Sequence, residues 1–270
     1  MKPFLKIAFF TAVGVFAFIG LLFTLVFVGM RFGFLNVRGS NMQRNAFFQI
    51  FQNAAPCDTH GQLICAWNQT PEWKTVSGGL EKDAPVIEKV SQETGIPARV
   101  IAAVVVPEQL RFFTSEREIF KSYFEPLKIL GSLSQFSLGV SGVKQETAGE
   151  IEKNVPSQLA ALIAYTPEEG AHDAALYTRL TNPKDHYYSY LYTALYIKEV
   201  EAQWQQSGFD IRNRPGIIAT LFNIGFANSK PKADPQVGGA PIDIGGTTYL
   251  FGELAENFYN SNELGDIFLK

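Results

Sequence analysis

The chain is poor in the side chains that most often bind metal ions or form catalytic triads. It contains two cysteines and three histidines in 270 residues. The histidines, His60, His172 and His186, are far apart in the sequence and match neither a metal-ligand nor a triad spacing. The glycine pairs at 238–239 and 245–246 lack the strand and helix that flank a phosphate-binding loop. We therefore expect no metal site and no cofactor.

Positive charge is also scarce. The formal net charge is −3, the isoelectric point is near 5.7, and no basic cluster alternates with aromatic residues. Nucleic-acid-binding proteins usually carry a concentrated basic surface. This composition argues against a nucleic acid partner.

One long segment near the start has no charge at all. From Ile7 to Met30 the residues are almost entirely apolar. A helix of this length spans roughly 36 Å, enough for a hydrocarbon core of about 30 Å. The run is too long for a cleaved signal peptide and no small-residue cleavage pattern follows it. We predict that residues 1–34 form an uncleaved signal anchor, which would make the chain a single-pass cell-membrane protein.

The side of the membrane is suggested by the cysteines rather than by the flanking charges. Lysines and arginines on the two sides of the apolar run are nearly balanced, so the positive-inside rule does not decide the orientation. Cys57 and Cys65 are eight positions apart, with Gly61 able to turn the loop between them. A local disulfide fits this spacing and would place the soluble part outside the cytoplasm. The alternative is two unpaired, buried thiols, which would not indicate the side of the membrane.

Beyond the anchor, helical periodicity dominates and strand signals are weak. We expect a juxtamembrane segment (35–80), a helical domain (81–230) and a C-terminal extension (231–270). Turn residues at 77–79 precede the first expected helix. Helices are predicted at 80–94, from 97, at 144–153, at 157–164, at 186–206, from 215 and at 252–259. Gly245-Gly246 favours a hairpin between two short strands. The fold class is therefore mainly α with a small β-hairpin.

Glu108 is the candidate catalytic residue. It follows an apolar helical stretch that begins at Ile96 and ends at Pro107. Burial disfavours the charged form of a carboxyl group, so such a glutamate can stay protonated and serve as a general acid. The alternative is that Pro107 interrupts the helix and Glu108 simply emerges into solvent.

Four segments in order resemble the soluble lytic transglycosylase family, which has a goose-type lysozyme-like fold and cleaves peptidoglycan glycan strands. Gly95-Ile96-Pro97 leads a helix to Glu108, as in the family. The segment from Ser137 to Ala148 resembles the second family motif, Asn182 with Tyr190-Leu191 loosely echoes the third, and the segment from Thr220 to Gly225 resembles the fourth. The resemblance covers roughly residues 85–230.

This resemblance implies that Glu108 is the single acid/base. It also implies a substrate-binding role for Gly139, Ser141, Gly142, Tyr190 and Asn223 on a peptidoglycan strand. The chain departs from the family pattern at three positions: Gln109 replaces a serine, Gly142 a glutamine and Phe222 a tyrosine.

Two functions are consistent with this pattern. The first is a membrane-anchored lytic transglycosylase that acts on the bond between N-acetylmuramic acid and N-acetylglucosamine. The second is an inactive relative that binds glycan or acts as a scaffold for proteins of a cell-envelope machine. Three further carboxylates, those of Glu116, Glu118 and Glu146, are available as second acids, and we expect them to be solvated.

Overall fold

The computed structural model describes residues 57–58, 64–114 and 137–269, and single helical positions between Gly14 and Thr24. The chain divides into two compact units, Met1–Asn53 and Ala54–Lys270. Most of the expected anchor and all of residues 115–136, including Glu116 and Glu118, lie outside the described residues. Among the helices that are described, none has both the length and the hydropathy needed to cross a membrane.

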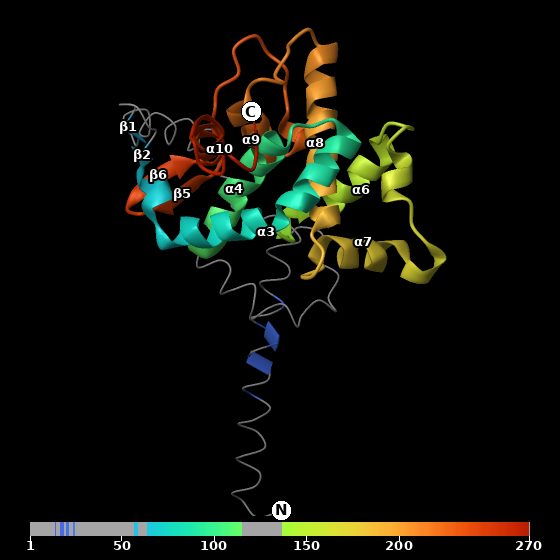
Figure 1. Ribbon diagram of the computed structural model, residues 1–270. Coiled ribbons are helices and arrows are strands. Elements are labelled where there is room, and N and C mark those ends of the chain that lie inside the picture. The colour runs from blue at the N-terminus through green and yellow to red at the C-terminus, as the bar shows by residue number, and fades with distance from the viewer. Residues whose placement is uncertain are drawn as a thin grey trace, which may run out of the picture. The chain divides into compact units, whose positions relative to one another are not determined.

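The described part of the second unit is mainly helical, as predicted (Figure 1). Its α-helices are α3 (Pro71–Thr94), α4 (Ala98–Thr114), α6 (Gln145–Asn154), α7 (His172–Thr181), α8 (Tyr187–Gln206), α9 (Pro215–Ile224) and α10 (Phe251–Asn260). Short 3-10 helices lie at Ala66–Gln69, Ala160–Ile163, Pro167–Glu169 and Phe226–Asn228. Three antiparallel strand pairs are β1 (Cys57–Asp58) with β2 (Ile64–Cys65), β3 (Ser137–Leu138) with β4 (Val143–Lys144), and β5 (Pro241–Ile244) with β6 (Thr247–Leu250).

Helix α4 lies at the centre of the hydrophobic core. Every side chain from Ile101 to Val106 is fully buried. Helices α3, α8, α9 and α10 and strand β5 all pack against α4 (Figure 1). Burial of each such valine or isoleucine contributes about 1.5–3 kcal/mol, so the apolar run is explained by its central position.

Helix α3 is longer than the sequence pattern predicts. The turn expected at 77–79 is wrong: the helix begins at Pro71, passes through Gly78 and Gly79, and ends at Thr94, with Gly95 as its C-cap. The Thr70 hydroxyl caps it by accepting a hydrogen bond from Trp73 N at 3.2 Å. Burial of Trp73, Val76 and Leu80 on one face offsets the poor helix propensity of the two glycines. Residues of the expected juxtamembrane segment therefore belong to the same core.

The C-terminal segment also packs into this core. The predicted hairpin is confirmed, with Ile244 opposite Thr247 across the Gly245-Gly246 turn. Helix α10 buries Phe251, Leu254 and Phe258 against α4 and α9.

The fully buried Arg99, in the first turn of α4, binds the backbone of residues 258–268. Its guanidinium donates hydrogen bonds of 2.7–3.2 Å to five backbone carbonyls, those of Phe258, Tyr259, Ser261, Glu263 and Phe268. Desolvation lowers the pKa of Arg99.

The two cysteines occupy opposite positions in the first strand pair. Cys57 is the register partner of Cys65 in the β1–β2 ladder. Cys65 is buried and disulfide-bonded. Cys57 is the only other cysteine in the sequence.

Candidate functional site

Glu108 lies within α4 rather than at its end. The helix continues through Pro107 to Thr114, because Leu110, one turn beyond Val106, is again fully buried. The alternative in which Pro107 interrupts the helix and releases Glu108 into solvent is therefore wrong. The Glu108 side chain is only 12% exposed, and Arg111, one turn further along, forms an ion pair with its Oε1.

A tight turn, residues 139–142, is pressed against Glu108. It joins β3 to β4 and has Gly139 and Gly142 at φ of +64° and +68°. A Cβ atom on Gly142 would lie 2.4 Å from Glu108 Oε1 and 2.5 Å from its Cδ. Only glycine leaves room for the carboxylate here. Next to Glu108, Gln109 Nε2 donates a hydrogen bond to the Val140 carbonyl of the same turn. The structure thus brings together Glu108, Gln109 and the Gly139–Gly142 segment.

The other side of this turn is fixed to the beginning of α8. The Ser141 hydroxyl is fully buried and donates to the Ser189 carbonyl at 2.9 Å. A Cβ on Gly139 would lie 2.0 Å from the Leu180 carbonyl oxygen and 2.4 Å from Ser189 Oγ. The Ser141 hydrogen bond therefore holds the turn in place, and the absence of a side chain at Gly139 lets the turn lie close to Leu180 and Ser189. In this conformation Ser141 does not offer its side chain to a substrate.

Tyr190 is likewise occupied inside the protein. It is 2% exposed, and its hydroxyl donates to Asp83 Oδ2 of α3 at 2.7 Å. Burial, reinforced by the Asp83 charge, raises the pKa of Tyr190 well above its ordinary value. Tyr190, which was expected to bind substrate, joins α8 to α3 through this hydrogen bond.

Asn223 anchors a loop. Its Oδ1 accepts a hydrogen bond from Ala240 N at 2.7 Å, and a Cβ on Gly239 would lie 3.0 Å from the same oxygen. The neighbouring Phe222, which replaces the family's tyrosine, packs on Phe251 and Tyr196. Asn223 thus holds residues 239–240 beside α9, and no hydrogen bond joins it to Glu108 among the described residues.

Two histidine–carboxylate clusters were missed by the sequence reading, because their members are distant in sequence. His186 Nδ1 lies 2.6 Å from Asp83 Oδ2, the atom that also accepts from Tyr190. His172 Nε2 lies 2.7 Å from Glu152 Oε2. Glu152 also accepts hydrogen bonds from the hydroxyls of Tyr165 and Tyr192. Only contacts across the folded chain reveal these pairings.

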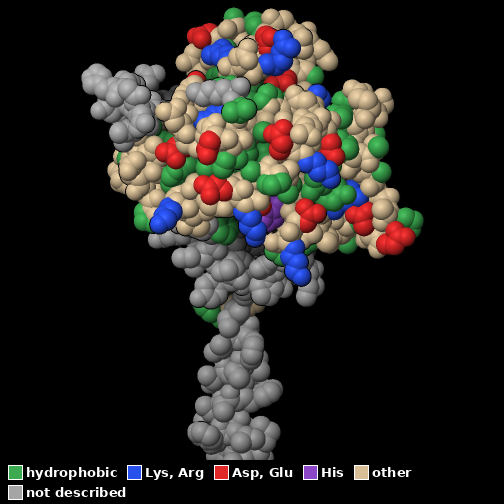
Figure 2. All heavy atoms as spheres, viewed as in Figure 1, with side chains coloured by type: hydrophobic (Ala, Val, Ile, Leu, Met, Phe, Trp, Pro, Cys, Tyr) green, Lys and Arg blue, Asp and Glu red, His purple; other side chains and the backbone are tan. Residues whose placement is uncertain are grey.

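Among the described residues, neither a patch of one charge nor a metal-binding group marks a second functional site. Lys, Arg, Asp and Glu side chains are interspersed over the face in Figure 2 without a patch of one sign. Glu146 is exposed in the first turn of α6. Within residues 57–58, 64–114 and 137–269, no three His, Cys, Asp or Glu side chains group closely enough to hold a metal ion.

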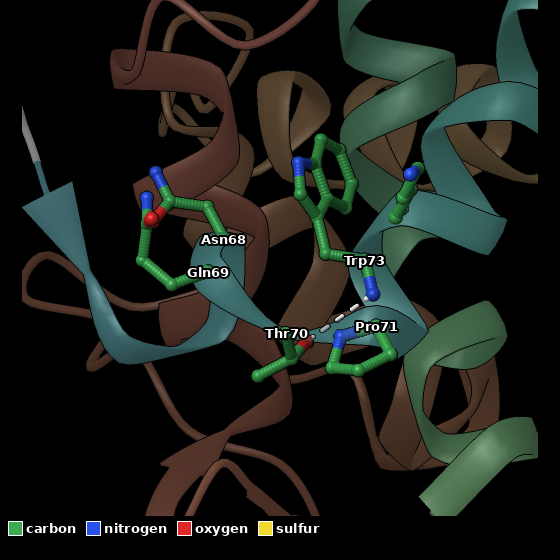
Figure 3. A pocket seen from close by; sticks show the side chains of 6 residues that line it. Asn68, Gln69, Thr70, Pro71 and Trp73 are labelled. Atoms are coloured by element: carbon green, nitrogen blue, oxygen red, sulfur yellow. Dashed lines mark hydrogen bonds between the residues drawn. The ribbon is translucent and has the colours of Figure 1, made fainter.

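An open hollow lies beside the beginning of α3 and is separate from Glu108. Its lining residues are Asn68, Gln69, Thr70, Pro71, Trp73 and Lys74 (Figure 3). The polar groups here hold the protein together. Thr70 caps α3, and Trp73 Nε1 donates to Glu263 Oε2 at 2.8 Å. We assign no function to this hollow.

Comparison of the chain with models of protein families, with curated proteins and with solved structures finds no match.

Proposed function

We propose that the chain is a membrane-anchored enzyme that cleaves peptidoglycan glycan strands, a divergent lysozyme-like lytic transglycosylase with Glu108 as its acid/base. The observation that carries this proposal is the burial of the Glu108 carboxylate against the Gly142 turn. That turn belongs to the segment that resembles the family's second motif. The disulfide at Cys65 supports a location of this unit outside the cytoplasm.

One carboxylate is enough for the proposed reaction. Glu108 donates its proton to the glycosidic oxygen as the bond to the anomeric carbon breaks. The resulting carboxylate then accepts the proton of the sugar's own 6-hydroxyl, whose oxygen bonds to the anomeric carbon and leaves a 1,6-anhydro end. Glu108 is thereby protonated again for the next cycle.

The ion pair between Arg111 and Glu108 must be broken before Glu108 can act as an acid. A guanidinium stabilises a neighbouring carboxylate in its ionised form, whereas a general acid must hold a proton. Bound glycan must therefore separate Arg111 from Glu108 before the acid step. Both side chains are long, and a rotation of Arg111 about its own bonds is enough to break the pair.

The same ion pair favours a second candidate, an inactive glycan-binding or scaffolding module of a cell-envelope machine. In such a protein the Glu108–Arg111 pair would be permanent. The three departures from the family pattern, Gln109, Gly142 and Phe222, agree with this candidate as well.

Zymography of the detergent-solubilised full-length protein on purified sacculi distinguishes the two functions. Glu108→Gln is the test variant, and Glu146→Gln, which changes an exposed carboxylate, is the matched control. We expect the wild type and Glu146→Gln to clear the sacculi and Glu108→Gln to leave them intact. Equal clearing by Glu108→Gln would refute the role of Glu108. Binding without clearing by every protein would identify the scaffold.

A further inference from the structure

Arg111 is a largely buried cation that is paired with the carboxylate the proposed reaction needs as an acid. Its Nη2 donates to Glu108 Oε1, and the Arg111 side chain is 22% exposed while that of Glu108 is 12% exposed. A largely buried guanidinium that loses its carboxylate becomes an uncompensated charge, which is strongly unfavourable. Separation of the pair is therefore costly unless another anion takes the place of Glu108.

The two described elements that meet at the pair do not supply this anion. Glu108 is the only acidic residue of α4, and the β3–β4 hairpin contains none. The other charged residues of these two elements are all basic, namely Arg99, Arg111 and Lys144. Once Glu108 holds a proton, as a general acid must, α4 and the hairpin carry only positive charge. The group that complements this surface is an anion carried by the ligand.

Glu108 is confined, whereas Arg111 has room to turn. A Cβ atom on Gly142 would lie 2.4 Å from Glu108 Oε1, so the carboxylate lies directly against the backbone of the turn. Gln109 donates a hydrogen bond to the backbone of the same turn and keeps this part of α4 against it. Phe112 lies one helical turn beyond Glu108 and is 52% exposed, so this face of α4 reaches solvent beside the pair. Arg111 is therefore the partner that moves when the ion pair separates.

We propose that Arg111 is the specificity residue of this site: it binds a carboxylate of the glycan strand, which replaces Glu108 as the partner of the guanidinium. This inference rests on the proposed function and keeps Glu108 as the single acid/base. Peptidoglycan offers such groups, because its peptide stems end in carboxylates and a muramic acid without a stem ends in a lactyl carboxylate. As the guanidinium turns to the substrate, Glu108 takes up a proton from solvent. It then gives this proton to the glycosidic oxygen as the bond breaks.

This exchange of partners makes the acid depend on the charge of the substrate. A guanidinium forms strong, charge-assisted hydrogen bonds with a carboxylate, and a neutral amide does not match them. A strand without carboxylates leaves Arg111 on Glu108 and leaves Glu108 ionised. The site should therefore discriminate against neutral strands even where the sugars are identical.

The kinetic test compares soluble peptidoglycan strands with the same strands after their carboxylates have been converted to amides, using the full-length protein. We expect amidation to lower the wild-type kcat/KM at least about tenfold, as for the loss of one charge-assisted hydrogen bond. Arg111→Met should cleave both preparations with equal kcat/KM. It should also cleave the amidated strands faster than the wild type does, because Glu108 is no longer held in its ionised form.

Arg212→Met is the matched control, because it removes an exposed arginine that is paired with Asp210. This variant should keep the wild-type preference for native strands. An arginine with a merely structural role would lower the activity of Arg111→Met on both preparations alike and would leave the wild type indifferent to amidation. Equal wild-type kcat/KM on the two preparations would overturn the inference.

A binding measurement does not depend on turnover. In Glu108→Gln the neutral amide stands in for the protonated acid. Calorimetric titration of this variant should give a Kd at least about tenfold lower for native than for amidated strands, and Glu108→Gln/Arg111→Met should give equal values. Strands without stems identify the source of the carboxylate. Tighter binding than to intact strands assigns the lactyl carboxylate, and weaker binding assigns a stem carboxylate.

The outcomes separate this inference from the proposed function. If the wild type cleaves both preparations equally while Glu108→Gln cleaves neither, only the inference fails. If the wild type does not cleave but Glu108→Gln prefers native strands through Arg111, the proposed catalysis fails and Arg111 remains the carboxylate-binding residue of a glycan-binding module. If there is neither cleavage nor a preference that depends on Arg111, both fail.

Discussion

Substitution of Gly142 by alanine tests the contact between the turn and Glu108 most directly. The new Cβ would lie 2.4–2.5 Å from Oε1, Cδ and Cγ of Glu108, far inside van der Waals contact. The carboxylate must rotate away, because the turn itself is held by Ser141 and Gln109. Its ion pair with Arg111 is then broken.

The expected loss of stability has two parts. A residue with a side chain at φ near +68° costs about 1–2 kcal/mol in backbone strain. Loss of a largely buried, charge-assisted hydrogen bond costs roughly 1.5–3 kcal/mol, reduced in proportion to the 22% exposure of Arg111. We expect Gly142→Ala to lower the free energy of unfolding by about 2–4 kcal/mol.

The assay is urea unfolding, with two matched variants. Gly95→Ala has a similar φ of +74° but nothing within 4 Å of the new Cβ, so it should show the backbone cost alone. Glu108→Ala removes the three atoms that collide and completes a double-mutant cycle with Gly142→Ala. In the Glu108→Ala background, Gly142→Ala should cost no more than Gly95→Ala does. Equal costs for Gly142→Ala and Gly95→Ala in the wild-type background, with no coupling in the cycle, would show that the contact is wrong.

Two further predictions concern the buried arginines. Arg99→Met removes five hydrogen bonds to carbonyls between Phe258 and Phe268, so we expect urea unfolding to show a loss of roughly 3 kcal/mol or more. Amide exchange in residues 258–268 should become faster, and unchanged exchange there would contradict the role of Arg99. Glu169 accepts hydrogen bonds from Arg179 at 2.5 and 2.7 Å, and this lowers the pKa of Glu169 to about 2 from 4.5. Because the pKa of Glu169 is lower in the folded state, this stabilisation is present above pH 4.5 and is lost as the pH falls toward 2. Glu169→Gln should therefore flatten the dependence of the free energy of unfolding on pH between 4.5 and 2. An unchanged dependence would count against the pairing of Glu169 with Arg179.

Local patterns predicted the elements whose signals are local. The alternation around Gly245-Gly246 predicted the hairpin because glycines favour its turn. The three- and four-residue recurrence of apolar residues from 186 to 206 predicted α8, in which every residue from Ser189 to Ile197 is buried. The start of α3 was mispredicted because the burial of Trp73 and Val76 overrides the turn preference of Gly78 and Gly79. Helix α7 has no strong signal of its own, since its position depends on contacts with α6 and α8.

The candidate site was predictable in part. The order of motifs pointed to Glu108 and the glycine turn, and the two do meet. The buried hydrogen bonds of Ser141 and Tyr190 were not predicted, because sequence gives no indication of which way a polar side chain on a helix or turn will point. Asp83 with His186 and Glu152 with His172 could not be predicted at all: their pairings join residues 103 and 20 positions apart, and neither spacing repeats a known motif.

The buried Arg99 has a consequence for biosynthesis. Its five acceptors all lie between Phe258 and Phe268, about 160 residues further along the chain. While the chain is being synthesised, the Arg99 cation at the beginning of α4 lacks these partners until residues 258–268 have left the ribosome. Cleavage after Asn260 would remove three of the five acceptors, those of Ser261, Glu263 and Phe268, and so loosen the packing of the helix that also carries Glu108.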